Sequence, residues 1–185
     1  MAIAQEITII ESGLSFLDWV DSLTGDAKTA ALAAVADRDA KFEAQLAAGN
    51  VYISNTGKRV WVSLETEQVH MDEVGQAYAD LWIQWAEETG GSLTINFDDT
   101  LLDEDKVMPF AGWARANLSS TDYTTFVSQS TEISAAVAAA VTEGKATENE
   151  GSYTVTDVAF HDELKAAYPL FKSTREAYES YLATL

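Results

Sequence analysis

The sequence predicts an α+β fold: a single domain in which a small antiparallel sheet of about five strands packs with about six or seven helices. Two observations predict this class. Some segments place apolar residues with a period of two, typical of strands, and others with a period of 3.6, typical of helices. These segments do not follow one another in regular β–α alternation, which disfavours a doubly wound parallel sheet. A length of 185 residues fits one domain and allows a core without disulfides.

The N-terminal part of the chain is predicted to contain one strand and two helices. Residues 5–10 include three isoleucines and form a strand that Ser12-Gly13 ends. Apolar residues at helical spacing from Phe16 to Leu23 mark a short helix. The alanine-rich segment 27–48 has high helix propensity and stops at Gly49-Asn50, because glycine accepts the left-handed conformation that follows many helix ends.

The stretch 51–89 is predicted to be the organising centre, because it holds three of the five tryptophans. Segments 51–54 and 59–64 are rich in β-branched and aromatic residues and flank the turn sequence Asn-Thr-Gly-Lys, which predicts a hairpin. Trp61 alternates with two valines, so the second strand is apolar on both faces. Such a strand is covered on both sides, or one side awaits a partner.

A helix is expected to begin at Asp72, where the apolar period changes to 3.6, and to end at Gly90-Gly91. Its apolar stripe includes Tyr78 and Trp85. Ile83 points to the opposite, polar side of this helix. It is either a single exposed isoleucine or a contact with another subunit.

The remainder of the chain is predicted to be mainly helical. Strands are expected at 92–97 and 153–158, and helices at 110–117, at 119–143 in one or two pieces, at 161–168, and from about Ser173 to the end. Pro169 is expected to bend the chain, because the residue before a proline avoids the helical conformation. Residues 145–151 are the best candidate for an exposed loop or linker before a C-terminal strand–helix unit.

The charge of the chain is strongly negative and unevenly distributed. Thirty acids against 11 bases give −19, and the segment from Val60 to Asp105 holds 12 acids and no Lys or Arg. Such a surface repels nucleic acid and anionic lipid, and it attracts cations or a basic protein face. Three explanations stay open: solubility or adaptation to salt, an acidic docking face, and mimicry of the phosphate array of DNA.

Several classes of site are excluded or not indicated. The chain has no cysteine, which excludes disulfides, thiolate metal sites and cysteine nucleophiles. It has no phosphate-binding glycine loop, dinucleotide fingerprint, G-x-S-x-G or H-E-x-x-H motif, so no cofactor is expected. The longest apolar run, 135–141, is too short for a membrane span, and the N-terminus does not resemble a signal peptide. We therefore expect a soluble protein, cytoplasmic or associated with a particle.

Two groups of residues are candidate metal ligands. In order along the chain, His70, Asp72 and His161 resemble the two-His-one-carboxylate iron site of 2-oxoglutarate oxygenases. That family places its ligands on a jelly roll, whereas helices are expected here, so surface or capping roles are preferred. The acidic loop 98–105 could ligate Ca²⁺ or Mg²⁺, but it lacks the glycine and the closing glutamate of an EF-hand. A solvated loop is preferred, with these residues as weak candidates: Asp98, Asp99, Asp103 and Asp105.

Together these observations favour a non-catalytic structural or accessory protein. We expect it to bind other protein subunits, either copies of itself or different proteins, in a larger assembly such as a virion or similar particle. In composition the chain is similar to structural and accessory proteins of tailed viruses. The candidate contact residues are Tyr52, Trp61, Ile83, Tyr178 and Tyr181. An acidic DNA-mimic inhibitor of a nucleic-acid-binding protein is the alternative, and a metal-dependent enzyme that uses the two histidines is a less favoured one.

Overall fold

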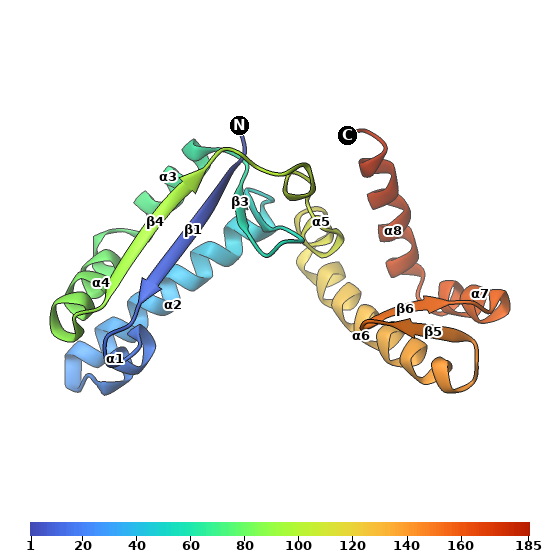
Figure 1. The fold of residues 1–185 in the computed structure, drawn as a ribbon, viewed down its shortest axis with the longest axis horizontal. Helices are drawn as coiled ribbons and strands as arrows, with labels where there is room; N and C mark the ends of the chain where they lie inside the picture. The colour runs from blue at the N-terminus through green and yellow to red at the C-terminus, as the bar shows by residue number, and fades with distance from the viewer. The chain divides into compact units, whose positions relative to one another are not determined.

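The computed structural model describes residues 1–185 and has the predicted α+β class. It contains eight α-helices, one short 3₁₀-helix and six strands, which form a four-stranded and a two-stranded antiparallel sheet (Figure 1). The chain divides into two compact units, Met1–Gly112 (unit 1) and Trp113–Leu185 (unit 2). That the chain forms a single domain stays a prediction. None of the helices is both long enough and apolar enough to cross a membrane.

The sheet of unit 1 has the strand order β2-β3-β1-β4. Strands β2 (Val51–Ile53) and β3 (Arg59–Trp61) form the predicted hairpin. Strand β1 (Ile3–Ile10) pairs with β4 (Ser92–Asp98) over residues 4–10, but it pairs with β3 only over residues 3–5. Beyond Gln5, therefore, β1 and β4 continue as a two-stranded ribbon, which is visible in Figure 1 as the two long neighbouring arrows.

The hairpin end of this sheet is covered on both faces. On one face Ile3, Val51 and Trp61 pack against Phe42 and Leu46 of helix α2 (Gly25–Ala47). On the other face the buried residues belong to the hairpin, to β1 and to the segment that follows β4, as follows: Ala4, Tyr52, Val60 and Leu101, with Met108 beside them. Both apolar faces of β3 are thus covered by other residues of unit 1.

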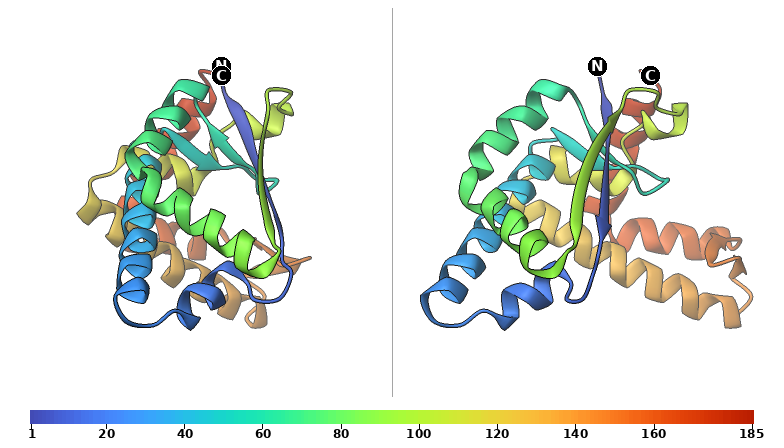
Figure 2. Two further views of the ribbon diagram at one scale, coloured as in Figure 1. Left: turned by 90° about the vertical axis from the view of Figure 1, so that its left-hand side faces the viewer. Right: turned by 60° about the vertical axis from the view of Figure 1, so that its left-hand side comes forward.

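A second core lies between helices and contains no residue of the sheet. Helices α1 (Phe16–Ser22), α2 and α4 (Gln76–Thr89) enclose an aromatic cluster in which Phe16 stacks on Trp82 with ring centroids 3.8 Å apart. Trp85 is completely buried there and donates a 3.0 Å hydrogen bond from Nε1 to the carbonyl oxygen of Leu14. In Figure 2 the helices of unit 1 lie on one side of the β1–β4 ribbon.

The prediction of a single helix from Asp72 is wrong in its start. Helix α3 (Leu64–Val74) begins eight residues earlier, capped by Ser63, whose hydroxyl accepts a hydrogen bond from the backbone N–H of Thr66. Gly75, with φ 77°, then separates α3 from α4. Residues 62–64, predicted to extend the second strand, instead lead into this helix.

Unit 2 is mainly helical. Helix α5 (Phe110–Asn117) begins in unit 1 and ends in unit 2. Helix α6 (Ser120–Thr142) is one continuous helix, capped by Ser119, whose hydroxyl accepts a hydrogen bond from the backbone N–H of Asp122. The hairpin of β5 (Ala146–Asn149) and β6 (Ser152–Val155) follows. Helices α7 (Val158–Ala167) and α8 (Pro169–Leu182) complete the unit. Val137 and Ala140 of α6 pack with Ala146 to form its small core.

Two predictions about unit 2 need correction. The expected loop or linker at 145–151 is mostly exposed, but it forms strand β5 and the turn of a hairpin. Glu150 and Gly151 occupy that turn with φ of 49° and 80°, a conformation that the sequence pattern indicated only through its glycine. The bend expected at Pro169 is confirmed, since Tyr168, with φ −123° and ψ 66°, is not helical and separates α7 from α8. Pro169 itself begins α8, because a proline at the first helical position loses no hydrogen bond. The final helix therefore starts four residues before Ser173.

Candidate protein-binding surface

Most of the predicted contact residues lie in the interior. Trp61 is only 1% exposed, and Tyr52 is buried with its hydroxyl donating a 2.8 Å hydrogen bond to the carbonyl oxygen of Asp105. Tyr178 is buried and Tyr181 half-buried, and both rings lie against Trp113. The two-sided apolarity that suggested a partner surface is satisfied by unit 1 itself. Of the five candidates only Ile83, which is 54% exposed, has most of its side chain free for a partner.

The two histidines belong to different units. His70 lies in unit 1, buried beside Trp61 with ring centroids 5.2 Å apart, whereas His161 lies on α7 of unit 2. Asp72 is exposed on α3. No group of three His, Asp or Glu side chains is close enough to hold an ion. The sequence therefore contains the three residue types in the order of the iron site, but the structure does not show them grouped around a common point.

The carboxylates of the acidic loop have separate partners. Asp98 accepts a 2.8 Å hydrogen bond from the backbone N–H of Thr100, and Asp103 forms an ion pair of 2.8 Å with Lys106. Asp99 is exposed. Asp105 is completely buried, and its carboxylate accepts a hydrogen bond from Thr56 and lies 3.4 Å from Nζ of Lys58.

The role of Asp105 in this loop is structural. Hydrogen bonding from Thr56 holds the pKa of Asp105 below its usual range. The buried carboxylate fastens the segment after β4 to the tip of the β2–β3 hairpin. It is not one of a set of ligands that converge on a cation.

Helix α3 turns polar residues inward, towards the sheet. Its buried residues are Glu67, His70 and Val74, while Val69 and two other apolar residues are exposed. The buried side chain of Glu67 belongs to a hydrogen-bonded cluster around Gln5. Gln5 accepts a hydrogen bond from Arg59 at 3.0 Å and donates one to Glu67 at 3.3 Å.

Burial shifts the titration of this polar cluster. It raises the pKa of Glu67, and it lowers the pKa of His70, with nearby Arg38 adding to the lowering. Both shifts favour the neutral forms. Nδ1 of His70 has no hydrogen-bond partner. The cluster joins β1, β3 and α3 by hydrogen bonds, which gives it a role in the fold of unit 1.

The β1–β4 ribbon carries an apolar face that remains partly exposed. Residues directly opposite one another in an antiparallel pair share a face, and so do alternate residues of one strand. The register therefore places five apolar side chains on the face that also carries Ile3 and Gln5, which contact α2 and α3: Ile7, Ile9, Leu93, Ile95 and Phe97. We call this the ribbon face. Ile9 and Phe97 are each 44% exposed. The aromatic core of the helices contains none of these residues.

Both edges of the ribbon are open as well. Strand β4 is the last strand of the sheet, and residues 6–10 of β1 pair only with β4. Natural proteins blunt such edges with lysine, proline or bulges, because free N–H and C=O groups otherwise pair with other chains. Here β4 reads Ser-Leu-Thr-Ile-Asn-Phe-Asp and carries neither lysine nor proline. The open edge of β4 therefore lacks the lysine or proline that would block pairing with another strand.

The segments that carry or surround the ribbon have charge of one sign. Residues 1–27 contain five acids and residues 60–105 contain 12, and neither segment contains a Lys or Arg. A partner face with basic residues around an apolar centre would complement both properties.

The ribbon was visible in the sequence only as two strands. The alternation of isoleucines in β1 and of Leu93, Ile95 and Phe97 in β4 marks a single apolar face, but alternation does not say whether that face is covered. Only the placement of the helices decides it. Comparisons with models of protein families, with curated proteins and with solved structures found no match to this chain.

Proposed function

We propose that this chain is a non-catalytic structural or accessory protein that binds another protein subunit in a larger assembly, of which a virion or similar particle would be one example. The observation that carries the proposal is the ribbon face: five apolar side chains on one face of a strand pair that has two open edges. Burying the exposed remainder of each such side chain contributes on the order of 1 kcal/mol. Strand addition at an open edge would supply backbone hydrogen bonds besides.

The partner we propose is a protein with an apolar strand or face that is flanked by Lys and Arg. The base-free acidic segments around the ribbon support this choice, because opposite charge at the rim speeds encounter and fixes orientation. A second copy that presents the same acidic surface would meet repulsion at the rim, so a different protein is favoured over self-association.

The experiment compares a ribbon variant with a matched control from the opposite face of the same strand. Ile7→Thr with Ile9→Thr keeps the β propensity of both positions and removes the apolar contact, whereas Thr8→Ser changes the other face. Size exclusion with light scattering is run on each purified chain with and without extract of the source cells. Mass spectrometry then identifies any protein that joins the complex.

We expect the unaltered chain and Thr8→Ser to form a complex of fixed stoichiometry with one basic protein, and the double variant to remain free. A complex that the double variant forms equally well would overturn the assignment of the ribbon. A chain that stays monomeric in every extract would overturn the function itself.

One further function has a specific observation in its favour. The base-free segments 1–27 and 60–105 support an acidic inhibitor that occupies the basic groove of a nucleic-acid-binding protein. Salt distinguishes the two proposals. Such an inhibitor complex would weaken steeply between about 0.05 and 0.5 M salt, because exposed charge pairs are screened, whereas an interface centred on the ribbon face would persist.

A further inference from the structure

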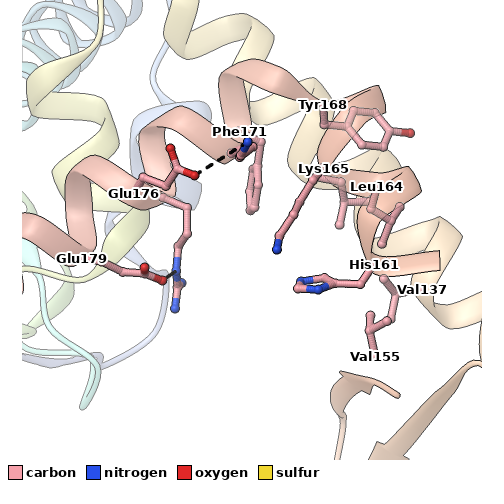
Figure 3. A pocket seen from close by; sticks show the side chains of 12 residues that line it. Val137, Val155, His161, Leu164, Lys165, Tyr168, Phe171, Glu176 and Glu179 are labelled. Atoms are coloured by element: carbon pink, nitrogen blue, oxygen red, sulfur yellow. Dashed lines mark hydrogen bonds and ion pairs between the residues drawn. The ribbon is translucent and has the colours of Figure 1, made fainter. Parts of the chain in front are cut away.

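Unit 2 contains a half-open hollow of about 470 Å³ between α6, α7, α8 and strand β6. Its floor is apolar and consists of five side chains, Ile133, Val137, Val155, Leu164 and Phe171. Figure 3 shows Val137 and Val155 at one end of this space and the ring of Phe171 pointing into it. Sites for small molecules have volumes of about 300–1,000 Å³ and mainly apolar walls with a few polar groups that fix orientation. The hollow of unit 2 matches that description.

Two cationic or titratable side chains reach into the hollow from α7. His161 and Lys165 lie one helical turn apart, and both point into the space (Figure 3). Neither side chain has a hydrogen bond or an ion pair within the protein. They therefore leave N–H donors free over an apolar floor.

The opposite wall of the hollow is electrically balanced. On α8, Lys172 lies 3.9 Å from Glu176, and Arg175 lies 3.1 Å from Glu179. All four residues line the hollow, and Figure 3 shows the two glutamates across the space from α7. The uncompensated positive charge is consequently on the side of Lys165.

This positive charge stands out in a chain of net charge −19. From Phe160 to Leu185 there are three bases, Lys165, Lys172 and Arg175, and all three line the hollow. The second hollow, lined by Ala31, Ala34, Leu81 and neighbouring residues, contains no charged side chain.

We propose that the hollow of unit 2 binds a small anionic amphiphile, a carboxylate that carries an unbranched apolar chain. The carboxylate accepts hydrogen bonds from Lys165 and His161, and the chain lies on the floor formed by Val137, Val155 and Leu164. An anion on Lys165 gains a charge-assisted hydrogen bond, and the chain gains the burial of apolar surface. Because all of these residues belong to unit 2, this site does not depend on the ribbon face.

The test uses decanoate as the probe, below the concentration at which it forms micelles, with the full-length chain at about 0.15 M salt. At that ionic strength the Debye length is about 8 Å, so the distant acids of the chain are screened. Decanol has the same chain without the charge, and acetate has the charge without the chain. Backbone amide NMR shifts measure both the affinity and the location of binding.

We expect decanoate to saturate one site, with shifts confined to residues of α6, β6, α7 and α8 that line the hollow, and decanol and acetate to bind at least tenfold more weakly. Lys165→Gln should weaken decanoate roughly three- to tenfold, as the loss of one exposed charge-assisted contact. Lys145→Gln is the matched control, since Lys145 belongs to the same unit but pairs with Glu143 outside the hollow. It should leave the affinity unchanged. Glu176→Gln, which removes an acid from the wall, should strengthen binding.

Three results would overturn the proposal. The first is decanoate binding that does not saturate or that shifts residues of the ribbon face instead. The second is an equal loss of affinity in Lys165→Gln and Lys145→Gln. The third is binding to vesicles of phosphatidylglycerol without binding to free decanoate, which would assign the cations to a membrane surface.

Discussion

Nε2 of Gln5 donates a 3.3 Å hydrogen bond to Oε1 of Glu67, which links β1 to α3 across 62 positions of the chain. The amide oxygen of Gln5 accepts from Arg59 and from Trp61 of β3. One glutamine thus joins two strands and a helix, and the carboxyl group of Glu67 is held out of water as a consequence. The inner face of α3 thus carries an ionisable side chain, Glu67, where most helices carry an apolar one. The stability of unit 1 therefore depends on pH.

The first prediction concerns Glu67→Gln. Burial raises the pKa of Glu67 in the folded protein above its ordinary value of 4.5, so the carboxyl group favours folding below about pH 4.5 and loses that contribution as pH rises through the raised pKa. The variant keeps an acceptor for Gln5 and cannot ionise. We expect it to unfold at a higher temperature than the unaltered chain at pH 7 and at the same temperature near pH 4. Thermal melts followed by circular dichroism measure this. Glu65→Gln, an exposed position on the same helix, should show no such difference.

The second prediction concerns His70, whose pKa shift has the opposite consequence. Burial lowers the pKa of His70 below 6.5, so the neutral ring stabilises the fold above pH 6.5, and this contribution is lost as pH falls towards the lowered pKa. His70→Gln should therefore show a smaller loss of stability between about pH 6.5 and 5 than the unaltered chain. Urea titrations at several pH values measure the free energy of unfolding. If the free energy of unfolding changed equally with pH in the two proteins, the burial of an ionisable ring at position 70 would be contradicted.

Much of the fold could be predicted from local pattern. The isoleucines of β1, the turn sequence of the β2–β3 hairpin and the capping serine of α6 each place an element by a rule that acts within a few residues. The start of α3 could not be found in this way. Its inward face carries Glu67 and His70, so it lacks the apolar stripe that marks a helix, and the preceding Val60-Trp61-Val62 reads as a longer strand.

The candidate surface was harder to predict than the fold, because exposure is set by residues far away in the sequence. Trp61 and Tyr52 were candidates for partner contact since both faces of the hairpin are apolar, yet α2 and the segment after β4 cover them. Ile7 and Ile9 belong to a strand with the same apolar alternation, yet they remain 39% and 44% exposed. The same alternation therefore occurs in covered and uncovered strands, and only the path of the helices separates the two.

The third prediction concerns the buried carboxylate of Asp105. Hydrogen bonding from Thr56 lowers its pKa, so the ionised form stabilises the fold above about pH 3.8 and that contribution is lost as pH falls. Asp105→Asn should unfold at a lower temperature than the unaltered chain at pH 7. The difference between the two unfolding temperatures should become smaller as the pH falls. Asp103→Asn is the control, because Asp103 is fully exposed and pairs only with Lys106. If the two variants melt alike at pH 7, Asp105 does not fasten the loop to the hairpin.

The last prediction concerns the close approach of Gly91 to Trp85. A Cβ atom at position 91 would lie 2.4 Å from the indole ring, far inside van der Waals contact, and the ring is completely buried in the aromatic core. Gly91→Ala should therefore destabilise unit 1 by about 1–3 kcal/mol through overpacking. Adding Trp85→Phe, which removes the atoms that clash, should make the effect of Gly91→Ala smaller than it is beside the tryptophan. A Cβ atom at position 144 would have no other atom within 4 Å, and Gly144 has a positive φ. Gly144→Ala therefore tests only the cost of placing alanine in that conformation, about 1 kcal/mol. Unfolding free energies of Gly91→Ala, Trp85→Phe, the double variant and Gly144→Ala are measured in urea. A Gly91→Ala effect that is the same with tryptophan or phenylalanine at position 85 would show that the approach of backbone to ring does not limit this site.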